Sequence, residues 1–455
     1  MKKKDLELYT FKIDYIFLIL PIFTFGYYLN NHLNSFFLAD FDYLALNEVI
    51  LNTLKGNFFE TTHYTKFIKA NYLSHHLAFI LVLFVPFQYL TEIRLGYAYG
   101  MYFLFIINLI LPYFILFKYD KNDSERFLVF ILIITNSFFY KLSFSYHFEV
   151  IFFTLVLLSY LFKKLNYTKL ELISLIFCLL IKEDIFIYVI IYSIYFYIYD
   201  KEKRYLTLIL ISILYFLVFY FYLQPNLPKE AKVDWLSNWS FYTDINPFKS
   251  FLEKVLSKTN IFVKIFFIFI LCFILRGSTI LILSPIFILH FSSDRIWYNT
   301  FENYYIYTIL PLLSIFTIDT FIKSTFKYKK YILLFSLSFL CYNYSLDKTI
   351  PYKLKIENPV EVQNLKKIIQ LIPLGKEVSI SYDLGAFIPK DIKLYPIRPE
   401  HLNREYILYN SKSFSPFVEL NEIESKLVYE KKYIMINEIG NYKLWKKINN
   451  DLKHQ

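Results

Sequence analysis

The chain has 455 residues, of which 56% are hydrophobic and 19% charged, and its formal net charge is +11. A soluble chain of this length carries roughly a quarter charged residues, so the composition excludes an ordinary soluble protein and indicates one that folds in a bilayer. The positive charge does not indicate nucleic-acid binding, because no basic patch lies outside the short loops where membrane proteins collect Lys and Arg. Cys178, Cys272 and Cys341 lie far apart inside apolar runs, which is typical of buried small side chains.

Apolar runs of about the length that spans a bilayer, or somewhat shorter, follow one another along the chain. They lie at 13–30, 74–90, 97–117, 127–145, 148–162, 168–182, 185–199, 205–223, 261–275, 278–290, 305–322 and 331–346. The first run follows a basic start without a small-residue cleavage site, so we expect a retained span and no signal peptide.

Clusters of Lys and Arg in short loops predict the orientation. They lie at 118–126, 163–169, 201–204 and 323–330, and Lys2–Lys4 places the N-terminus in the cytoplasm as well. All these clusters can be cytoplasmic only if one of the two apolar runs at 74–90 and 97–117 does not cross the membrane. The run at 74–90, which is short and contains Pro86, fits a helix that lies on the outer surface. The sequence therefore predicts a polytopic α-helical membrane protein with about eleven crossings and an extracytoplasmic C-terminus.

Two parts are expected: a membrane module over 1–346, whose first outer loop covers 31–96, and a small extracytoplasmic α/β domain over 347–455. In the second part, a helix near 359–371 leads through Gly375 to a strand at 378–382. Further strands are predicted at 393–397 and 406–409. A closing hairpin would pair 433–437 with 442–445.

The first outer loop carries Asp40 and Asp42, separated by one residue. Such carboxylates can share a divalent cation such as Mg or Mn, or one of them can act as a general base. The alternative is a helix-capping pair just after the first span, because two Asp at this spacing are frequent by chance. His63, His75 and His76 lie in the same loop, where ordinary interfacial residues are the alternative interpretation.

Other ionisable residues stand at the ends of predicted spans, where a charge is costly and tends to face a cavity or a partner. Lys182 has the alternative of a structural pair with Glu183 or Asp184. Arg94 and Arg295 suit either a phosphate or an anchor at the headgroups. The predicted topology puts all these residues outside, so we expect one outer polar cavity. It would gather Asp40, Asp42, His76, Arg94, His147, Glu149, Lys182, Glu183, Asp184 and Arg295.

The chain resembles the prokaryotic membrane proteins catalogued as domain of unknown function 2079, over nearly its whole length. The stretch 41–56 resembles the family's opening, with Leu44, Glu48 and Leu51 in place of the expected Gly, Gln and Trp. Later motifs are similar too. They are His76 with Pro86, Ser145–Glu149 with Phe148 replacing a proline, Lys182-Glu183-Asp184, and Ile372-Pro373 with the strand that follows.

That family is similar to the GT-C superfamily of membrane glycosyltransferases. The resemblance implies a GT-C-like fold and transfer of a sugar from a polyprenyl-phosphate carrier, at the outer face of the cytoplasmic membrane. It implies that Asp42 is the catalytic residue and that Asp40 is its partner. We therefore expect an inverting glycosyltransferase whose partners are a lipid-linked sugar donor and the membrane lipid itself, with no nucleic acid.

Two other functions remain open from the sequence. A transporter or lipid-handling protein predicts ionisable residues near the bilayer midplane and two related halves. Neither feature stands out in this chain. A non-catalytic membrane assembly protein requires nothing of Asp42.

Overall fold

A computed structural model describes most of the chain. The described residues are 41–63, 70–119, 123–226, 246–301, 303–346, 359–413, 420–429 and 432–448, with scattered positions in 19–34 and at 244. The contacts divide the chain into two compact units. The helical unit comprises Phe103–Ile350 with His76–Ile80, and the α/β unit comprises Ile19–His75, Leu81–Tyr102 and Pro351–Gln455. The α/β unit thus joins residues of the predicted first outer loop to residues of the predicted C-terminal domain.

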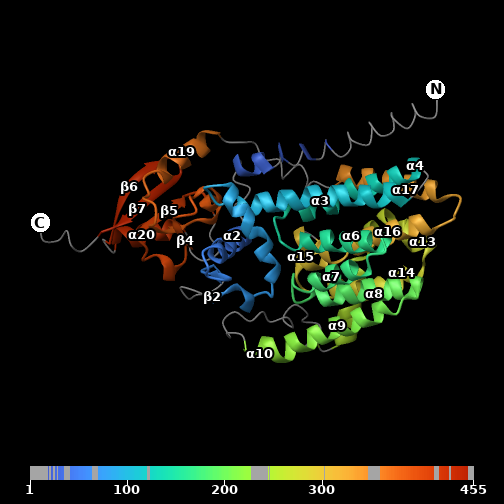
Figure 1. The fold of residues 1–455 in the computed structure, drawn as a ribbon. Helices are drawn as coiled ribbons and strands as arrows, with labels where there is room; N and C mark the ends of the chain where they lie inside the picture. The colour runs from blue at the N-terminus through green and yellow to red at the C-terminus, as the bar shows by residue number, and fades with distance from the viewer. Residues whose placement is uncertain are drawn as a thin grey trace, which may run out of the picture. The chain divides into compact units, whose positions relative to one another are not determined.

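The helical unit consists of helices, most of which follow the predicted apolar runs (Figure 1). They are α3 (Gly96–Tyr119, which begins in the α/β unit), α4 (Asp123–Ile134), α5 (Ser137–Phe144), α6 (Val150–Lys164), α7 (Thr168–Cys178), α8 (Ile185–Asp200), α9 (Arg204–Val218), α10 (Gln224–Asn226), α11 (Pro247–Ser257), α12 (Thr259–Ile268), α13 (Ile270–Leu275), α14 (Ser278–Phe291), α15 (Ile296–Asn299), α16 (Leu310–Lys323) and α17 (Lys329–Leu346). Helices α10, α11 and α15 lie outside the predicted apolar runs. A π-helical turn at Phe219–Leu223 extends α9, and a 3₁₀ helix at Asn303–Thr308 precedes α16.

Helix α16 lies at the centre of this unit. Every residue from Leu310 to Phe321 is buried, which is the pattern of a helix packed on all sides. It packs against α4, α6 and α13. Aromatic side chains make much of the contact, and the rings of Tyr195 and Phe316 stack with their centroids 3.7 Å apart. The arrangement holds the ends of α6, α8 and α16 close together.

Only some of the helices have the length of a membrane span. In the described part of the chain, Gly96–Leu116 and Arg204–Leu223 are long and apolar enough to cross a bilayer. The pair Glu125–Ile134 and Ser137–Phe144, bent by 41°, makes a third span if it is counted as one. Other apolar helices, such as Ile185–Asp200, have 10–17 residues. The prediction of about eleven crossings is therefore not confirmed, because most of the described helices are shorter than a bilayer span.

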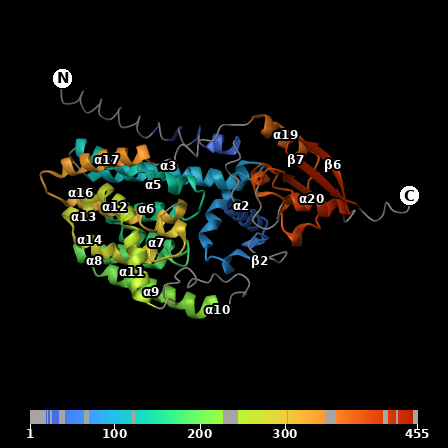
Figure 2. The same cartoon turned by 180° about the vertical axis from the view of Figure 1, so that it is seen from behind.

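The α/β unit contains a five-stranded sheet and the helices that cover it (Figure 2). Its elements are α2 (Phe41–Leu54), β1 (Glu60–Thr61), β2 (Ala70–Asn71), α19 (Pro359–Ile369), β3 (Glu377–Ile380), β4 (Lys393–Pro396), β5 (Tyr406–Asn410), α20 (Leu420–Tyr429), β6 (Tyr433–Ile439) and β7 (Tyr442–Lys447), with 3₁₀ helices at Tyr72–Ser74, Phe79–Leu90, Tyr382–Phe387 and Pro399–His401. The strand order is β4-β3-β5-β7-β6, in which β4, β3 and β5 are parallel and β7 is antiparallel to β5 and β6.

The two faces of this sheet are covered by different helices. Successive residues of β5 point to opposite faces of the sheet. Leu408 belongs to the apolar core that includes Leu365 of α19. Ile407 belongs to a second core, with Leu427 of α20. The structure confirms the predicted helix, the strands and the hairpin. Helix α20 was not predicted, and the strand expected to end at Tyr382 ends at Ile380.

Close backbone approaches tie the predicted first loop to the C-terminal sheet within the α/β unit. A Cβ atom added to Gly385 would lie 2.2 Å from Cδ2 of Leu44 in α2, so any larger residue there would force the Leu44 side chain to move. The backbone N–H of Lys390 donates to the carbonyl of Glu92 at 3.0 Å. The helix at Phe79–Leu90, whose position on the membrane surface stays a prediction, packs on Gly100 in α3.

Candidate functional site

Six of the predicted site residues meet in the helical unit. His147 and Glu149 lie in the turn between α5 and α6, and Lys182, Glu183 and Asp184 lie in the turn between α7 and α8. His76 joins them from the short segment His76–Ile80. All but His76 are buried, and His76 is half-buried. We call this set, together with Tyr307, the carboxylate cluster.

Lys182 is the central cation of the carboxylate cluster. Its Nζ donates to Oε1 of Glu149 at 3.0 Å and lies 5.5 Å from the ring centroid of Tyr307. Nδ1 of His147 lies 3.6 Å from the other oxygen of Glu149. Lys182 therefore forms an ion pair with Glu149, whereas the alternative named from the sequence was a pair with Glu183 or Asp184.

The two following carboxylates have different partners. Oε1 of Glu183 lies 2.7 Å from Nδ1 of His76, and its Oε2 accepts from the backbone N–H of Leu77 at 3.1 Å. Oδ2 of Asp184 accepts a hydrogen bond from the Tyr307 hydroxyl at 2.5 Å. Its Oδ1 is buried and has no hydrogen-bond partner among the described residues. Oε2 of Glu149, 3.6 Å from His147, likewise has no hydrogen-bond partner among the described residues, so two carboxylate oxygens of the cluster are left open.

The charges of the cluster are unbalanced. Three carboxylates face one lysine, so the balance depends on whether His76 and His147 are protonated. Burial raises the pKa of Asp184 to about 6; the charge of Glu183 acts in the same direction, while Lys182 and the Tyr307 hydroxyl oppose it. A buried carboxyl that titrates near neutral pH can take up and release a proton, which is typical of functional sites.

The remaining predicted residues lie elsewhere. Asp42 is half-buried in the first turn of α2, in the α/β unit. Arg94 is buried in the same unit, where its Nη2 donates to the carbonyl of Ile392. Arg295 is exposed just before α15, and Asp40 lies outside the described residues. One cavity that gathers all ten residues stays a prediction, because they belong to two units.

No metal centre emerges among the residues that the structure describes. They contain no group of three or more His, Cys, Asp or Glu side chains placed to hold an ion. A shared ion at Asp40 and Asp42 stays a prediction, since Asp40 is not among them. The position of Asp42 also suits the capping alternative, because a negative charge in the first turn stabilises a helix.

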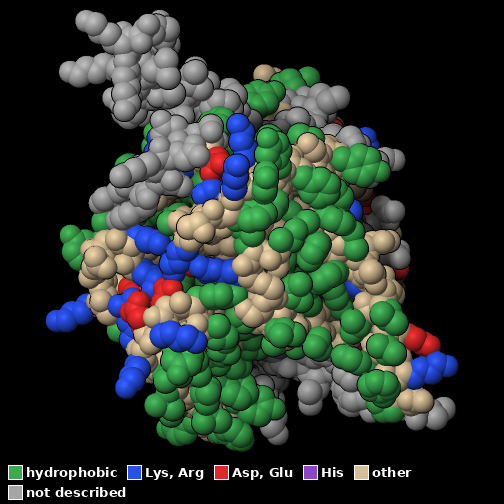
Figure 3. Space-filling view, turned by 90° about the vertical axis from the view of Figure 1, so that its right-hand side faces the viewer, with side chains coloured by type: hydrophobic (Ala, Val, Ile, Leu, Met, Phe, Trp, Pro, Cys, Tyr) green, Lys and Arg blue, Asp and Glu red, His purple; other side chains and the backbone are tan. Residues whose placement is uncertain are grey.

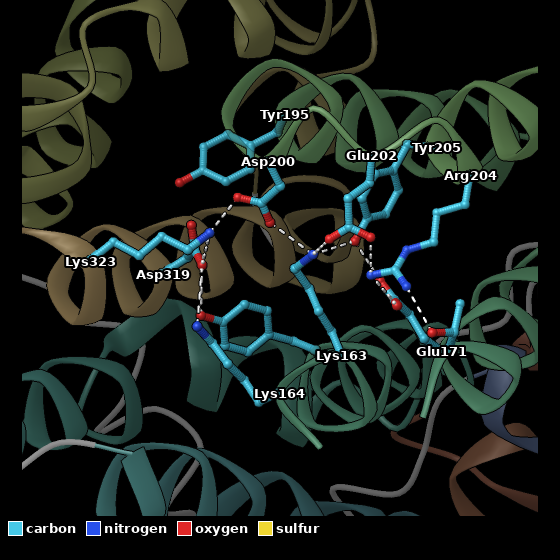
Figure 4. A network of polar contacts seen from close by, with 12 residues as sticks. Lys163, Lys164, Glu171, Tyr195, Asp200, Glu202, Arg204, Tyr205, Asp319 and Lys323 are labelled. Carbon is cyan, nitrogen blue, oxygen red and sulfur yellow. Dashed lines mark hydrogen bonds and ion pairs between the residues drawn. The ribbon is translucent and has the colours of Figure 1, made fainter. Parts of the chain in front are cut away.

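The sequence missed a second ionic cluster, at the other ends of the same helices (Figure 4). We call it the paired network. It comprises Lys163, Lys164, Glu171, Asp200, Glu202, Arg204, Arg276, Asp319 and Lys323. From the sequence, the lysines of this network were interpreted as ordinary loop charges. Asp319, which lies inside the apolar run 305–322, was the signal that could have revealed the network. On the face drawn in Figure 3, Lys and Arg gather in one region with Asp and Glu among them, and hydrophobic side chains cover wide areas.

Asp319 is the centre of the paired network. It is fully buried, and its carboxylate accepts from the Tyr160 hydroxyl at 2.8 Å. Arg276, Lys323 and Lys164 lie 2.7, 3.0 and 3.7 Å from its oxygens. This carboxylate has a partner on each oxygen.

Comparison with known proteins agrees with the membrane character of the sequence. A family model described as a predicted membrane protein, DUF2079, matches residues 32–421. The chain belongs to the DUF2079 family. The predicted resemblance is confirmed, and the match spans α2, all the helices named in the helical unit, and β3 to β5. No curated protein and no solved structure matches the chain. Membership of DUF2079 states no activity, so activity has to be argued from the residues.

Proposed function

We propose that this protein is a membrane glycosyltransferase, which moves a sugar from a polyprenyl-phosphate carrier to an acceptor at the outer face of the cytoplasmic membrane. The observation that supports this proposal best is the carboxylate cluster. Three carboxylates beside one lysine are costly to bury in a membrane protein, and such groups are typical of functional sites. The open oxygen of Asp184 suits a polar group of a substrate, such as a sugar hydroxyl.

In the proposed reaction, the carboxylate of Asp42 takes the proton of an acceptor hydroxyl. The acceptor oxygen forms a bond to the anomeric carbon of the sugar, on the face opposite the carrier. The bond from that carbon to the phosphate oxygen breaks, and the phosphate keeps the electron pair. The configuration at the anomeric carbon is therefore inverted.

The phosphate that leaves gains negative charge and needs cations near it. His147 and Lys182 are the proposed groups, and the pairing of Lys182 with Glu149 means that the phosphate would share this lysine with a carboxylate. A divalent ion held by Asp40 and Asp42 would supply further positive charge. Chelation should then reduce transfer as strongly as substitution of either aspartate.

The test is Asp42→Asn, made in the full chain and expressed in a strain that lacks the gene. Transfer should fall by about a hundred- to ten-thousand-fold, because general-base catalysis is worth that much. Loss of a first-turn charge costs α2 only about 0.3–1 kcal/mol, so the amount of protein in the membrane should stay near normal. Asp244→Asn, at an exposed position, is the matched control.

The readout is the glycan that disappears in the deletion strain and returns with the wild-type gene. Full restoration of that glycan by the Asp42→Asn protein would refute the catalytic assignment. A deletion strain with unchanged glycans but altered uptake or export of a solute would replace the proposal with a transporter.

A further inference from the structure

The α/β unit contains a cavity of about 180 Å³ that includes no residue of the carboxylate cluster. Its walls come from α2, β1, the loop before α3, and the segment around β4. A single buried water needs only about 10–15 Å³ of such space, so a group of several heavy atoms fits. We call this cavity the basic pocket.

Most ionisable side chains of the basic pocket are cations. They are Lys55, Arg94, Lys390 and Lys393, against Glu48 and Glu60. The lining therefore carries a formal surplus of two positive charges. Asp391, which does not line the pocket, acts electrostatically on Lys55 and Arg94 and reduces the surplus without removing it.

Arg94 is the deepest of these cations, with 5% of its surface exposed. Its Nη2 donates to the carbonyl of Ile392 at 2.6 Å, while its Nε is buried without a hydrogen-bond partner among the described residues. Burial lowers the pKa of Arg94 to about 10, against the opposing charges of Glu48, Asp391 and Tyr43. A buried guanidinium that makes no ion pair in the described part of the chain is costly, and a bound anion would offset this cost.

Glu48 does not supply that anion, because its oxygens are occupied. Oε2 lies 2.6 Å from Nδ1 of His63 and accepts from the Thr61 hydroxyl and the Thr62 N–H. Oε1 accepts from the Thr62 hydroxyl at 2.8 Å. Burial by itself would raise the pKa of Glu48, but His63 and these hydrogen bonds outweigh it, so the pKa is lowered. Its carboxylate therefore interacts mainly with His63 and the two threonines.

The three lysines are held close together although their charges repel. Nζ of Lys55 donates to the carbonyl of Lys390 at 3.3 Å, and Nζ of Lys390 donates to the carbonyl of Thr91 at 3.1 Å. Glu92, 3.7 Å from Lys390, is 88% exposed. Burial, and after it the charge of Arg94 with smaller contributions from Lys393 and Lys390, lowers the pKa of Lys55. An anion between these lysines would relieve the repulsion.

We propose that the basic pocket binds a phosphoryl group, either as soluble phosphate or as a phosphate ester in a lipid headgroup. A phosphoryl group, with about one to two negative charges near neutral pH, suits the positive surplus that remains in the pocket. Its three oxygens can accept from donors on several sides, whereas a carboxylate offers two. Arg94 presents planar N–H groups at the base of the pocket, and the lysines at its rim act as point charges. This site does not depend on the proposed sugar transfer.

The first probe is inorganic phosphate, with the full-length protein purified in a non-ionic detergent. Binding is measured as the rise in Tm with phosphate concentration, with chloride added to keep the ionic strength constant. Arg94→Gln should raise the Kd by about tenfold or more, because a charge-assisted hydrogen bond is lost. Since Arg94 is buried and its variant can misfold, the double variant Lys55→Gln/Lys393→Gln carries the test, with an expected rise of about three- to tenfold.

The matched control is Lys366→Gln/Lys367→Gln, which removes the same charge from exposed positions of α19 in the same unit. Its Kd should equal that of the wild type. Equal weakening in the control and the rim variant would show a general effect of surface charge and would overturn the site. Unchanged binding in both pocket variants would also overturn it.

The second probe separates the two sources of the phosphoryl group. Detergent micelles doped with phosphatidic acid are compared with phosphatidylcholine micelles and with inorganic phosphate. If inorganic phosphate binds and phosphatidic acid binds no more tightly, the result supports a soluble ligand. Binding of phosphatidic acid alone, weakened by the pocket variants, supports a lipid headgroup. If neither probe binds, the proposal is wrong.

Discussion

The two ionic clusters of the helical unit lie at opposite ends of the same helices, yet they are built differently. Helix α6 follows Glu149 and ends with Lys163 and Lys164, and α8 follows Asp184 and ends with Asp200. With a rise of about 1.5 Å per residue, these helices separate the two clusters by about 22–24 Å. The same scaffold therefore carries both sets of charges.

Pairing distinguishes the clusters. In the paired network, five cations face four carboxylates, and Lys163 alone contacts Asp200 at 2.8 Å and Glu202 at 3.2 Å. In the carboxylate cluster, Lys182 is the one lysine beside three carboxylates, and an oxygen of Asp184 stays open. Charges that satisfy one another hold helices together, whereas charges left unsatisfied are available to a ligand. We therefore expect the paired network to contribute to stability, and the carboxylate cluster is the end that we propose to be functional.

The largest expected effect comes from Asp319→Asn in the paired network. The variant leaves Arg276, Lys164 and Lys323 around an uncharged amide, and breaking a buried ionic group from one side costs about 3–5 kcal/mol. The unfolding temperature of the purified protein should fall. The amount of protein in the membrane should fall as well. Transfer per folded molecule should not change. Asp244→Asn, at an exposed position, should unfold like the wild type.

The next effect has the opposite sign and comes from Asp184→Asn in the carboxylate cluster. A carboxyl whose pKa rises from 3.8 to about 6 on folding stabilises the protein below about pH 4, and this stability is lost as the pH rises through 6. At pH 7.5 the variant should therefore be as stable as the wild type or more stable, by about 1–3 kcal/mol. Transfer should fall, because the open oxygen is gone or replaced by a donor.

Thermal unfolding from pH 4 to 8 measures this difference. The wild type and the Asp184→Asn variant should converge at the acid end, where both side chains are neutral. A variant that is less stable than the wild type at pH 7.5 would mean that Asp184 has a structural role, and the contrast between the two ends would fail.

The smallest effect is expected for Lys323→Gln, at the edge of the paired network. Its side chain is 33% exposed and contacts Asp200 at 2.5 Å and Asp319 at 3.0 Å. Lys163 and Arg276 remain as partners of those carboxylates, and a partly exposed ion pair contributes about 0–1 kcal/mol. A loss of stability as large as that of Asp319→Asn would show that the network has no redundancy.

Local signals explain how much of the fold could be predicted. The strands of the C-terminal sheet are short segments rich in Tyr, Ile, Leu and Val that are separated by turns, with Gly375 and Gly440 at positive φ, so their positions followed from the sequence. Helix α20 was missed although Leu420, Ile423 and Leu427 have helical spacing. The predicted span count is not confirmed, and an apolar run does not show where a helix breaks, as the chain does at Phe269 between α12 and α13.

The candidate site was predictable only in part, because its contacts join distant residues. Glu149 and Lys182 could be named from their places at the ends of apolar runs, but their contact joins residues 33 positions apart. The basic pocket could not be predicted from the sequence, because its walls come from α2 and from the segment around β4, which are far apart in the chain. Arg94 could be suspected as a phosphate ligand, while Lys390 and Lys393 gave no local signal.

The contact between Arg94 and Ile392 has a consequence for how the protein folds during its synthesis. The two residues are 298 positions apart. At about 5–20 residues per second, a ribosome needs about 15–60 s to make that stretch, so the early part of the α/β unit waits this long for the rest. During that time Leu44 lacks Gly385, the partner that covers it. An interrupted chain would leave this apolar surface uncovered, which is what chaperones and proteases recognise, so only a finished chain can hide it.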